Sequence, residues 1–152
     1  MKKTFLIFSI LFLNSLFIFS QHLEIENGIY YKDNKLYTGT HKEYFENGNL
    51  KMEINIVSGI NDGLSIYYFE NGNKKEQQSY SKGEKEGIWI TWNKNGTKTA
   101  EARYLKGKKH GFWYIWDENG EIIREMKYEN GEKTGVWKMW DKNGNLIQER
   151  KY

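Results

Sequence analysis

The sequence predicts an all-β fold, an extended single twisted antiparallel sheet of about five tandem β-hairpins. Asn-Gly pairs recur at a step of 24 residues, and a second glycine series keeps the same step. Proline is absent, so no strand has to lose a backbone hydrogen bond. A period of this length is typical of an array of identical small units. The pairs begin at Asn47, Asn71, Asn95, Asn119 and Asn143, and the second series is Gly39, Gly63, Gly87, Gly111 and Gly135.

Residues 1–20 have the pattern of a secretory signal peptide. A basic start at residues 1–3 precedes an apolar run over residues 5–19, and Ser20 offers a small residue for cleavage before Gln21. The run is shorter than the roughly 20 residues of a membrane-spanning helix, although a retained N-terminal anchor is the alternative. Cleavage would leave 132 residues and an exported protein, in the periplasm, on the cell surface or outside the cell.

The composition of the remaining chain excludes several classes of function. Removal of Lys2 and Lys3 leaves 21 basic against 20 acidic side chains, so electrostatic binding of nucleic acid has little support. No cysteine is present, which excludes disulfides, thiolate metal sites and a lipid-modified cysteine. All six Trp and all eleven Tyr lie beyond residue 20, so the expected core is aromatic rather than aliphatic.

Each unit is expected to fold as one hairpin, illustrated by residues 87–104. A strand over residues 87–93 leads into an Asn-Gly turn, and residues 97–104 form the return strand. The turn is either a two-residue type I′ loop or a type I turn closed by a glycine bulge. Asp117 and Asp141 favour the second, because each carboxylate can cap its turn and the register then pairs Trp116 with Ile122.

This register predicts which side chains share a face of the sheet. Residues at odd positions after each unit's glycine are expected on one face. Residues at even positions, which include a Glu series and a second Trp series, are expected on the other. The odd set is Ile88, Ile90, Trp92, Tyr104, Phe112, Tyr114, Trp116, Ile122 and Tyr128, and the even set includes Lys127 and Lys151.

The remaining segments connect and close the array. Charged Gly-x-x-x-Gly links, such as residues 83–87 and 107–111, are expected to join successive hairpins by tight reversals. Residues 21–34 form a less regular cap, in which residues 29–31 can add an edge strand, and the repeat domain covers residues 35–152. The strand that ends at Tyr152 is expected to be an unprotected edge.

The pattern Gly-x-Trp-x-x-Trp-x-x-Asn-Gly, followed by Glu, Tyr and Gly, resembles the bacterial variant of the MORN repeat. Residues 111–131 are the clearest copy, and the resemblance covers residues 34–152, with His41 and Ser65 in place of Trp in the first two units. It implies elongated β-hairpin sheets that act as scaffolds or lipid-associated modules. Many such bacterial proteins are labelled antitoxins of toxin–antitoxin systems, a role that fits an exported chain only if the toxin is in the envelope.

No constellation of residues indicates catalysis. Catalysis needs a nucleophile with a base, paired carboxylates or a metal cluster. The three histidines, His22, His41 and His110, are scattered, and no pair has metal-ligand spacing. We therefore expect no catalytic residue, no metal and no cofactor.

Two residue series are candidates for binding. Trp89, Trp113 and Trp137 would form a platform for sugars, aromatic side chains or lipid headgroups, or else a second, thinner core. A row of carboxylates repeats every two strands, about 9–10 Å apart, which is too far for one shared metal ion. Cross-strand contacts with Trp or Lys explain this row more simply. The row comprises Glu53, Glu101, Glu125 and Glu149.

The sequence thus predicts an exported, non-enzymatic module that binds an unidentified protein through an aromatic face or an open edge strand. Neutralisation of a toxin partner is one alternative. Binding of an envelope glycan through the Trp series is another. Nucleic acid is not an expected partner, and a membrane is expected only as a surface contact.

Overall fold

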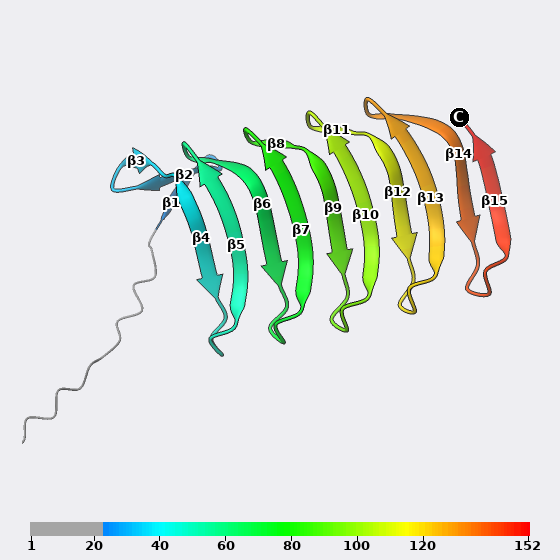
Figure 1. The fold of residues 1–152 in the computed structure, drawn as a ribbon, viewed down its shortest axis with the longest axis horizontal. Helices are drawn as coiled ribbons and strands as arrows, with labels where there is room; N and C mark the ends of the chain where they lie inside the picture. Colours follow the sequence, from blue (N-terminus) through cyan, green and yellow to red (C-terminus); the bar gives the residue numbers. More distant parts are fainter. Residues whose placement is uncertain (1–22) are drawn as a thin grey trace, which may run out of the picture.

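The computed structural model describes residues 23–152, so the predicted signal peptide lies outside the described residues. The chain forms two antiparallel sheets, a small one at the N-terminal end and a long one that continues to the C-terminus (Figure 1). Among residues 23–152, no helix has the length and apolar character needed to span a bilayer. The small sheet contains β1 (Glu24–Glu26), β2 (Ile29–Lys32) and β3 (Lys35–Leu36).

The long sheet confirms the predicted all-β architecture of tandem hairpins. Its ten principal strands follow one another in chain order, so each lies between its sequence neighbours (Figure 1). Two short strands, β8 (Glu84–Lys85) and β11 (Lys108–Lys109), pair with the strands that precede them. The principal strands are β4 (Gly39–Tyr44), β5 (Leu50–Val57), β6 (Ile60–Tyr68), β7 (Lys74–Ser81), β9 (Gly87–Trp92), β10 (Lys98–Leu105), β12 (Gly111–Trp116), β13 (Ile122–Glu129), β14 (Glu132–Trp140) and β15 (Leu146–Lys151). We number the hairpins β4–β5 to β14–β15 as units one to five.

The hairpin turns have the type I geometry with a glycine bulge that the sequence favours. In unit four, the Gly120 N–H donates to the Asp117 carbonyl at 3.2 Å, and Gly120 has a φ of 86°. The Asp117 carboxylate caps the turn by accepting hydrogen bonds from the N–H groups of Asn119 and Glu121, both at 2.9 Å. The predicted pair of Trp116 with Ile122 is confirmed.

The predicted division of side chains between the two faces is correct for the first strand of the hairpin, where Phe112, Tyr114 and Trp116 share a face, but wrong in the return strand beyond that pair. Trp116 pairs with Ile122, but Ile115 pairs with Arg124, so Ile123 is an extra residue in the return strand. Each of the five hairpins has such an extra residue at the same place in its return strand, in addition to the glycine bulge of the turn. One inserted residue exchanges the faces for the rest of the strand. Tyr104 and Tyr128 therefore lie with Trp89 and Trp113, and the Glu series lies with Phe112 and Tyr114.

We name the two faces by these residues. The ladder face carries Trp89, Trp113 and Trp137 together with the tyrosines at the ends of the return strands. The glutamate face carries Glu101 and Glu125, which pair across the strands with Ile90 and Tyr114.

The links stack on one another in a row, at the end of the long sheet where each return strand ends and the next hairpin begins. Each link contains a turn whose glycine donates its N–H to a carbonyl of the preceding link: Gly83 to Asn61, Gly107 to Lys85 and Gly131 to Lys109, at 2.8–2.9 Å. Because the same bond recurs at each step, it helps to fix the spacing of successive hairpins.

The N-terminal cap covers the ladder face of units one and two. Residues 29–31 form a strand as expected, but in the separate small sheet rather than at the edge of the long one. Tyr30 donates its N–H to the Gly59 carbonyl at 2.8 Å, and Gly59 donates to the Tyr37 carbonyl at 2.7 Å. The small sheet continues to Leu36, two residues beyond the predicted boundary of the cap.

Candidate functional site

The tryptophans of the ladder face form one continuous aromatic ladder with the tyrosines. Neighbouring ring centroids are 4.7–5.3 Å apart, which is the contact distance of interacting aromatic pairs. Each tryptophan lies between the tyrosine of the preceding unit and that of its own unit. The order of rings is Tyr80, Trp89, Tyr104, Trp113, Tyr128, Trp137 and Tyr152.

The polar edges of the indoles are also occupied. Trp89, Trp113 and Trp137 donate Nε1–H to the carbonyls of Ser79, Arg103 and Lys127, at 2.9, 3.0 and 3.1 Å. Each indole therefore bonds to the return strand of the preceding unit. Each indole of the predicted platform thus has a tyrosine on either side, and its N–H group is already hydrogen-bonded. This is the arrangement of a core rather than of a bare binding surface.

A row of lysines from the links covers the ladder. Lys85 lies 4.4 Å from the Trp89 ring centroid and 4.9 Å from that of Tyr104. Lys109 and Lys133 repeat this arrangement one and two units later, at 4.5–4.9 Å from their rings. Each ammonium group is attracted to two aromatic faces, so the lysine stems further shield the rings.

Units one and two have a different ladder face. His41 and Ser65 occupy the Trp position there, and both are buried. Between them lies Ile54, which pairs with each and is 1% exposed. Tyr30 of the cap lies near Glu43, and burial followed by this carboxylate raises the pKa of the Tyr30 phenol. The small side chains at the Trp positions leave room for the cap.

The glutamates on the other face contact basic side chains. Glu53 Oε2 lies 3.0 Å from Lys42 Nζ, and Glu101 Oε2 lies 3.0 Å from Lys98 Nζ. Glu125 and Glu149 both pair with Lys138, one on each side of β14. The Lys42–Glu53 contact and the register of Glu125 and Glu149 agree with the simpler interpretation of the carboxylate row as cross-strand pairs. Lys98 and Glu101 instead lie three residues apart in the same strand. The Trp series and the Glu series lie on opposite faces, so the structure does not bring them together.

The two histidines of the described part of the chain lie in different units, far apart in the repeat. His41 is buried on the ladder face, where its Nε2 is 3.5 Å from Glu43 Oε1, and His110 lies in the link before unit four. Residues 23–152 contain no group of three His, Cys, Asp or Glu side chains that could hold a metal ion. His22 lies outside the described residues.

The glutamate face is an open, partly apolar surface of the long sheet. Its exposed aliphatic and aromatic side chains lie beside a second row of half-buried tryptophans, Trp92, Trp116 and Trp140. Nothing in the described chain covers this face. Its exposed members include Leu64 (43%), Ile88 (37%), Phe112 (40%), Ile122 (40%) and Leu146 (50%).

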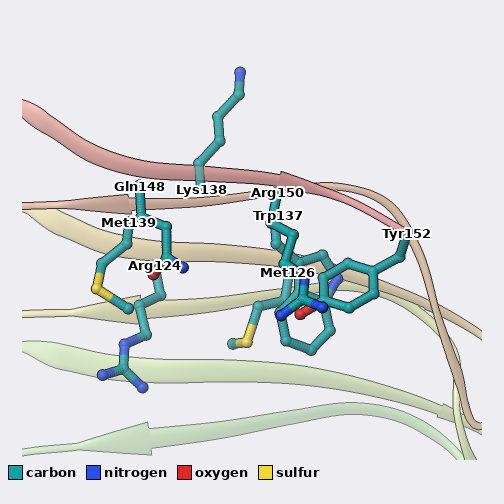
Figure 2. A pocket seen from close by; sticks show the side chains of 8 residues that line it. All are labelled: Arg124, Met126, Trp137, Lys138, Met139, Gln148, Arg150 and Tyr152. Carbon is teal, nitrogen blue, oxygen red and sulfur yellow. The ribbon is translucent and has the colours of Figure 1, made fainter.

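A small pocket lies on the ladder face at the C-terminal end of the sheet. It has a volume of about 110 Å³ and is lined by arginine, methionine and aromatic side chains of β13, β14 and β15 (Figure 2). The sequence analysis singled out Trp137 but not the arginine and methionine residues of this pocket, because the wrong register placed the β13 and β15 side chains on the opposite face from Trp137. The signal that points to them is a break in the repeat. The positions 13 and 15 residues after each unit's glycine differ from unit to unit, and only units four and five carry arginine there.

These observations define a class of protein, an open array of β-hairpins in which each unit contacts only its neighbours. Comparison with protein families matches residues 37–57, 61–82, 109–130 and 133–152 to the MORN repeat variant. The chain belongs to this family, as the resemblance predicted. Residues 87–108, between the matched segments, continue the same hairpin geometry. Comparison with curated proteins found no match.

Proposed function

We propose that this chain is an exported, non-enzymatic interaction module that binds a partner protein on its glutamate face. The observation that carries the proposal is the row of large apolar side chains, 37–50% exposed, on one side of an open sheet. Contiguous exposed apolar surface of this kind marks interaction sites in soluble proteins. MORN repeat proteins are repeat modules, commonly used in binding, which supports the general role.

The glutamates and the lysines beside them add polar groups to this face. Lys42 and Lys138 lie opposite glutamates on neighbouring strands, and Lys98 lies beside Glu101 in β10. Tryptophan and tyrosine with a polar surround are typical of the energetically important centre of protein interfaces. This pattern favours a protein partner over a ligand that needs an enclosed pocket.

The experiment is affinity capture from an envelope extract with residues 21–152 as bait. A double variant, Phe112→Glu with Ile122→Lys, places charges in the centre of the face. The matched control is Ile25→Lys on the cap, whose side chain is 58% exposed. Partners retained by the parent and by Ile25→Lys, but lost by the double variant, would support the proposal. Equal capture by all three proteins, or by none, would contradict it.

Toxin neutralisation is the same activity with a particular partner, and the resemblance to variant MORN proteins is its support. A toxin captured in this experiment, and inhibited by the bait, would establish it. Glycan binding through Trp89, Trp113 and Trp137 has less support, because these rings already contact tyrosines, lysines and backbone carbonyls.

A further inference from the structure

The pocket at the end of the ladder face combines positive charge with apolar surface. Arg124 of β13 and Arg150 of β15 lie on the two strands that flank β14, whose Trp137 and Met139 also line the pocket (Figure 2). Met126 completes the apolar part. The backbones of β13 and β15 are two strand spacings apart, about 9–10 Å. Arg124 pairs with Met139 and Arg150 with Trp137, so the two arginines are also offset along the strands and approach a ligand from opposite corners of the pocket.

The charge in this pocket is uncompensated. Among the described residues, neither Arg124 nor Arg150 forms an ion pair with a carboxylate. The ladder face of units four and five carries no Asp or Glu, whereas that of units one and two carries Glu43 and Glu76. The Arg150 guanidinium lies 4.9 Å from the Tyr152 ring centroid, within the range of a cation–π contact. A guanidinium in such a contact can still donate its N–H groups to a carboxylate.

The position of these residues in the repeat separates them from the fold-forming set. The Trp, Tyr and Gly positions recur because every hairpin needs them to pack on the next. Positions 13 and 15 after the unit glycine lie on the ladder face but follow no rule, so their side chains are not required to build a hairpin. In units one to five these pairs are Met52 and Ile54, Glu76 and Gln78, Ala100 and Ala102, Arg124 and Met126, and Gln148 and Arg150.

We propose that this pocket binds a linear peptide segment that carries an acidic side chain beside a large apolar one. Arg124 and Arg150 bind the carboxylate, and the apolar side chain packs on Met126, Met139 and Trp137. Charge-assisted bonds from arginine are among the stronger and more directional polar contacts. Methionine adapts its shape to a bound side chain, and Arg, Trp, Tyr and Met are the residues enriched at protein interfaces. This site is separate from the glutamate face.

The test is selection of binders from a display library of random linear peptides, with residues 21–152 as target. Selected peptides are then titrated against Arg124→Glu, Arg150→Glu and the matched control Arg103→Glu, which makes the same change on the glutamate face. Both arginines of the pocket are exposed, so the variants are expected to fold, and their thermal melting checks this. Met139→Glu tests the apolar part.

The expected result is a motif that pairs Asp or Glu with Leu, Met or an aromatic residue. Its affinity falls about tenfold or more in Arg124→Glu and Arg150→Glu, changes little in Arg103→Glu, and falls when the peptide's acid becomes an amide. Peptides without an acid, affinities unchanged by the pocket variants, or a library that yields no binder would overturn the proposal. None of these outcomes affects the capture experiment on Phe112 and Ile122, so the two proposals fail separately.

Discussion

Units one and two and units three to five share a 24-residue pattern but shield the ladder face by different means. In the C-terminal units, indole and phenol rings stack on each other and the link lysines cover them. In the N-terminal units the Trp positions hold His41 and Ser65, and a separate small sheet supplies the cover. A single sheet has no second layer for its core, so each part of the chain has to supply its own.

The two parts also differ at the hairpin tips. Asn47 and Asn49 donate side-chain hydrogen bonds to the Glu70 carbonyl of the next turn, at 3.2 and 2.8 Å. Asn71 and Asn73 repeat this with the Lys94 carbonyl, both at 2.9 Å. In unit three the second asparagine is replaced by Thr97. The N-terminal units are therefore joined at the tips by amides, and the C-terminal units along the ladder by aromatic rings.

The largest expected difference between the two parts comes from the same repeat position. Trp113→Ala removes the central ring of the ladder and should lower the free energy of unfolding by about 3 kcal/mol. Ser65→Ala should leave it unchanged or slightly raise it, because the buried hydroxyl has no hydrogen-bond partner among the described residues. Chemical denaturation measures both.

A milder variant separates the ring from its donor. Trp113→Phe keeps an aromatic contact but loses the bond to the Arg103 carbonyl, so a loss of about 1 kcal/mol is expected. If Trp113→Ala and Ser65→Ala were equally tolerated, the ladder would not be the core of the C-terminal units.

The second prediction concerns the attachment of the cap. Gly59 has a φ of +81°, and a Cβ there would lie 2.7 Å from Ile29 Cγ2 and 2.8 Å from Leu36 Cδ2. Gly59→Ala should therefore cost about 2 kcal/mol or more. Hydrogen exchange should show faster opening of β2 and β3. Gly107→Ala is the matched control, because its φ is +75° but no atom lies within 4 Å, so only the backbone cost of about 1 kcal/mol is expected. Equal losses would mean that the cap does not press on Gly59.

The third prediction uses the phenols beneath the cap. Burial, followed by neighbouring phenols and carboxylates, raises the pKa of Tyr67 to about 12. An unfolded tyrosine ionises near pH 10, so the unfolded chain loses this proton first. The contribution of the Tyr67 phenol to the free energy of unfolding is therefore fully present below about pH 10. It falls between about pH 10 and 12 and is lost above that range.

The measurement is the denaturation midpoint across this pH range. Tyr67→Phe should flatten the decline, while Tyr44→Phe, at a ring that is 55% exposed, is the matched control. A decline that is equally steep in Tyr67→Phe would place the responsible group elsewhere.

The sequence was sufficient for the repeat, the hairpins, the turn type and the pair of Trp116 with Ile122, because glycine and asparagine constrain the backbone locally. It was not sufficient to assign the side chains of the return strands to the two faces of the sheet. The extra residue at Ile123 has an ordinary side chain, and nothing at that position marks a bulge. The pocket at Arg124 and Arg150 was missed for the same reason, because a register error of one residue hides which side chains meet.

The smallest change in the free energy of unfolding is expected from a variant that transfers a feature of the N-terminal units to the C-terminal ones. Thr97→Asn would give unit three the asparagine that units one and two have, within reach of the Glu118 carbonyl of the next turn. A gain of about 0.5 kcal/mol is expected, at the low end for one exposed hydrogen bond. Asn73→Thr, the reverse change, should lose a similar amount, because its bond to the Lys94 carbonyl is broken. Opposite signs in the two variants would show that the amide joins adjacent tips independently of which core lies beneath them. A loss in both would mean instead that each tip is adapted to its own unit, and that the two halves of the array cannot exchange parts.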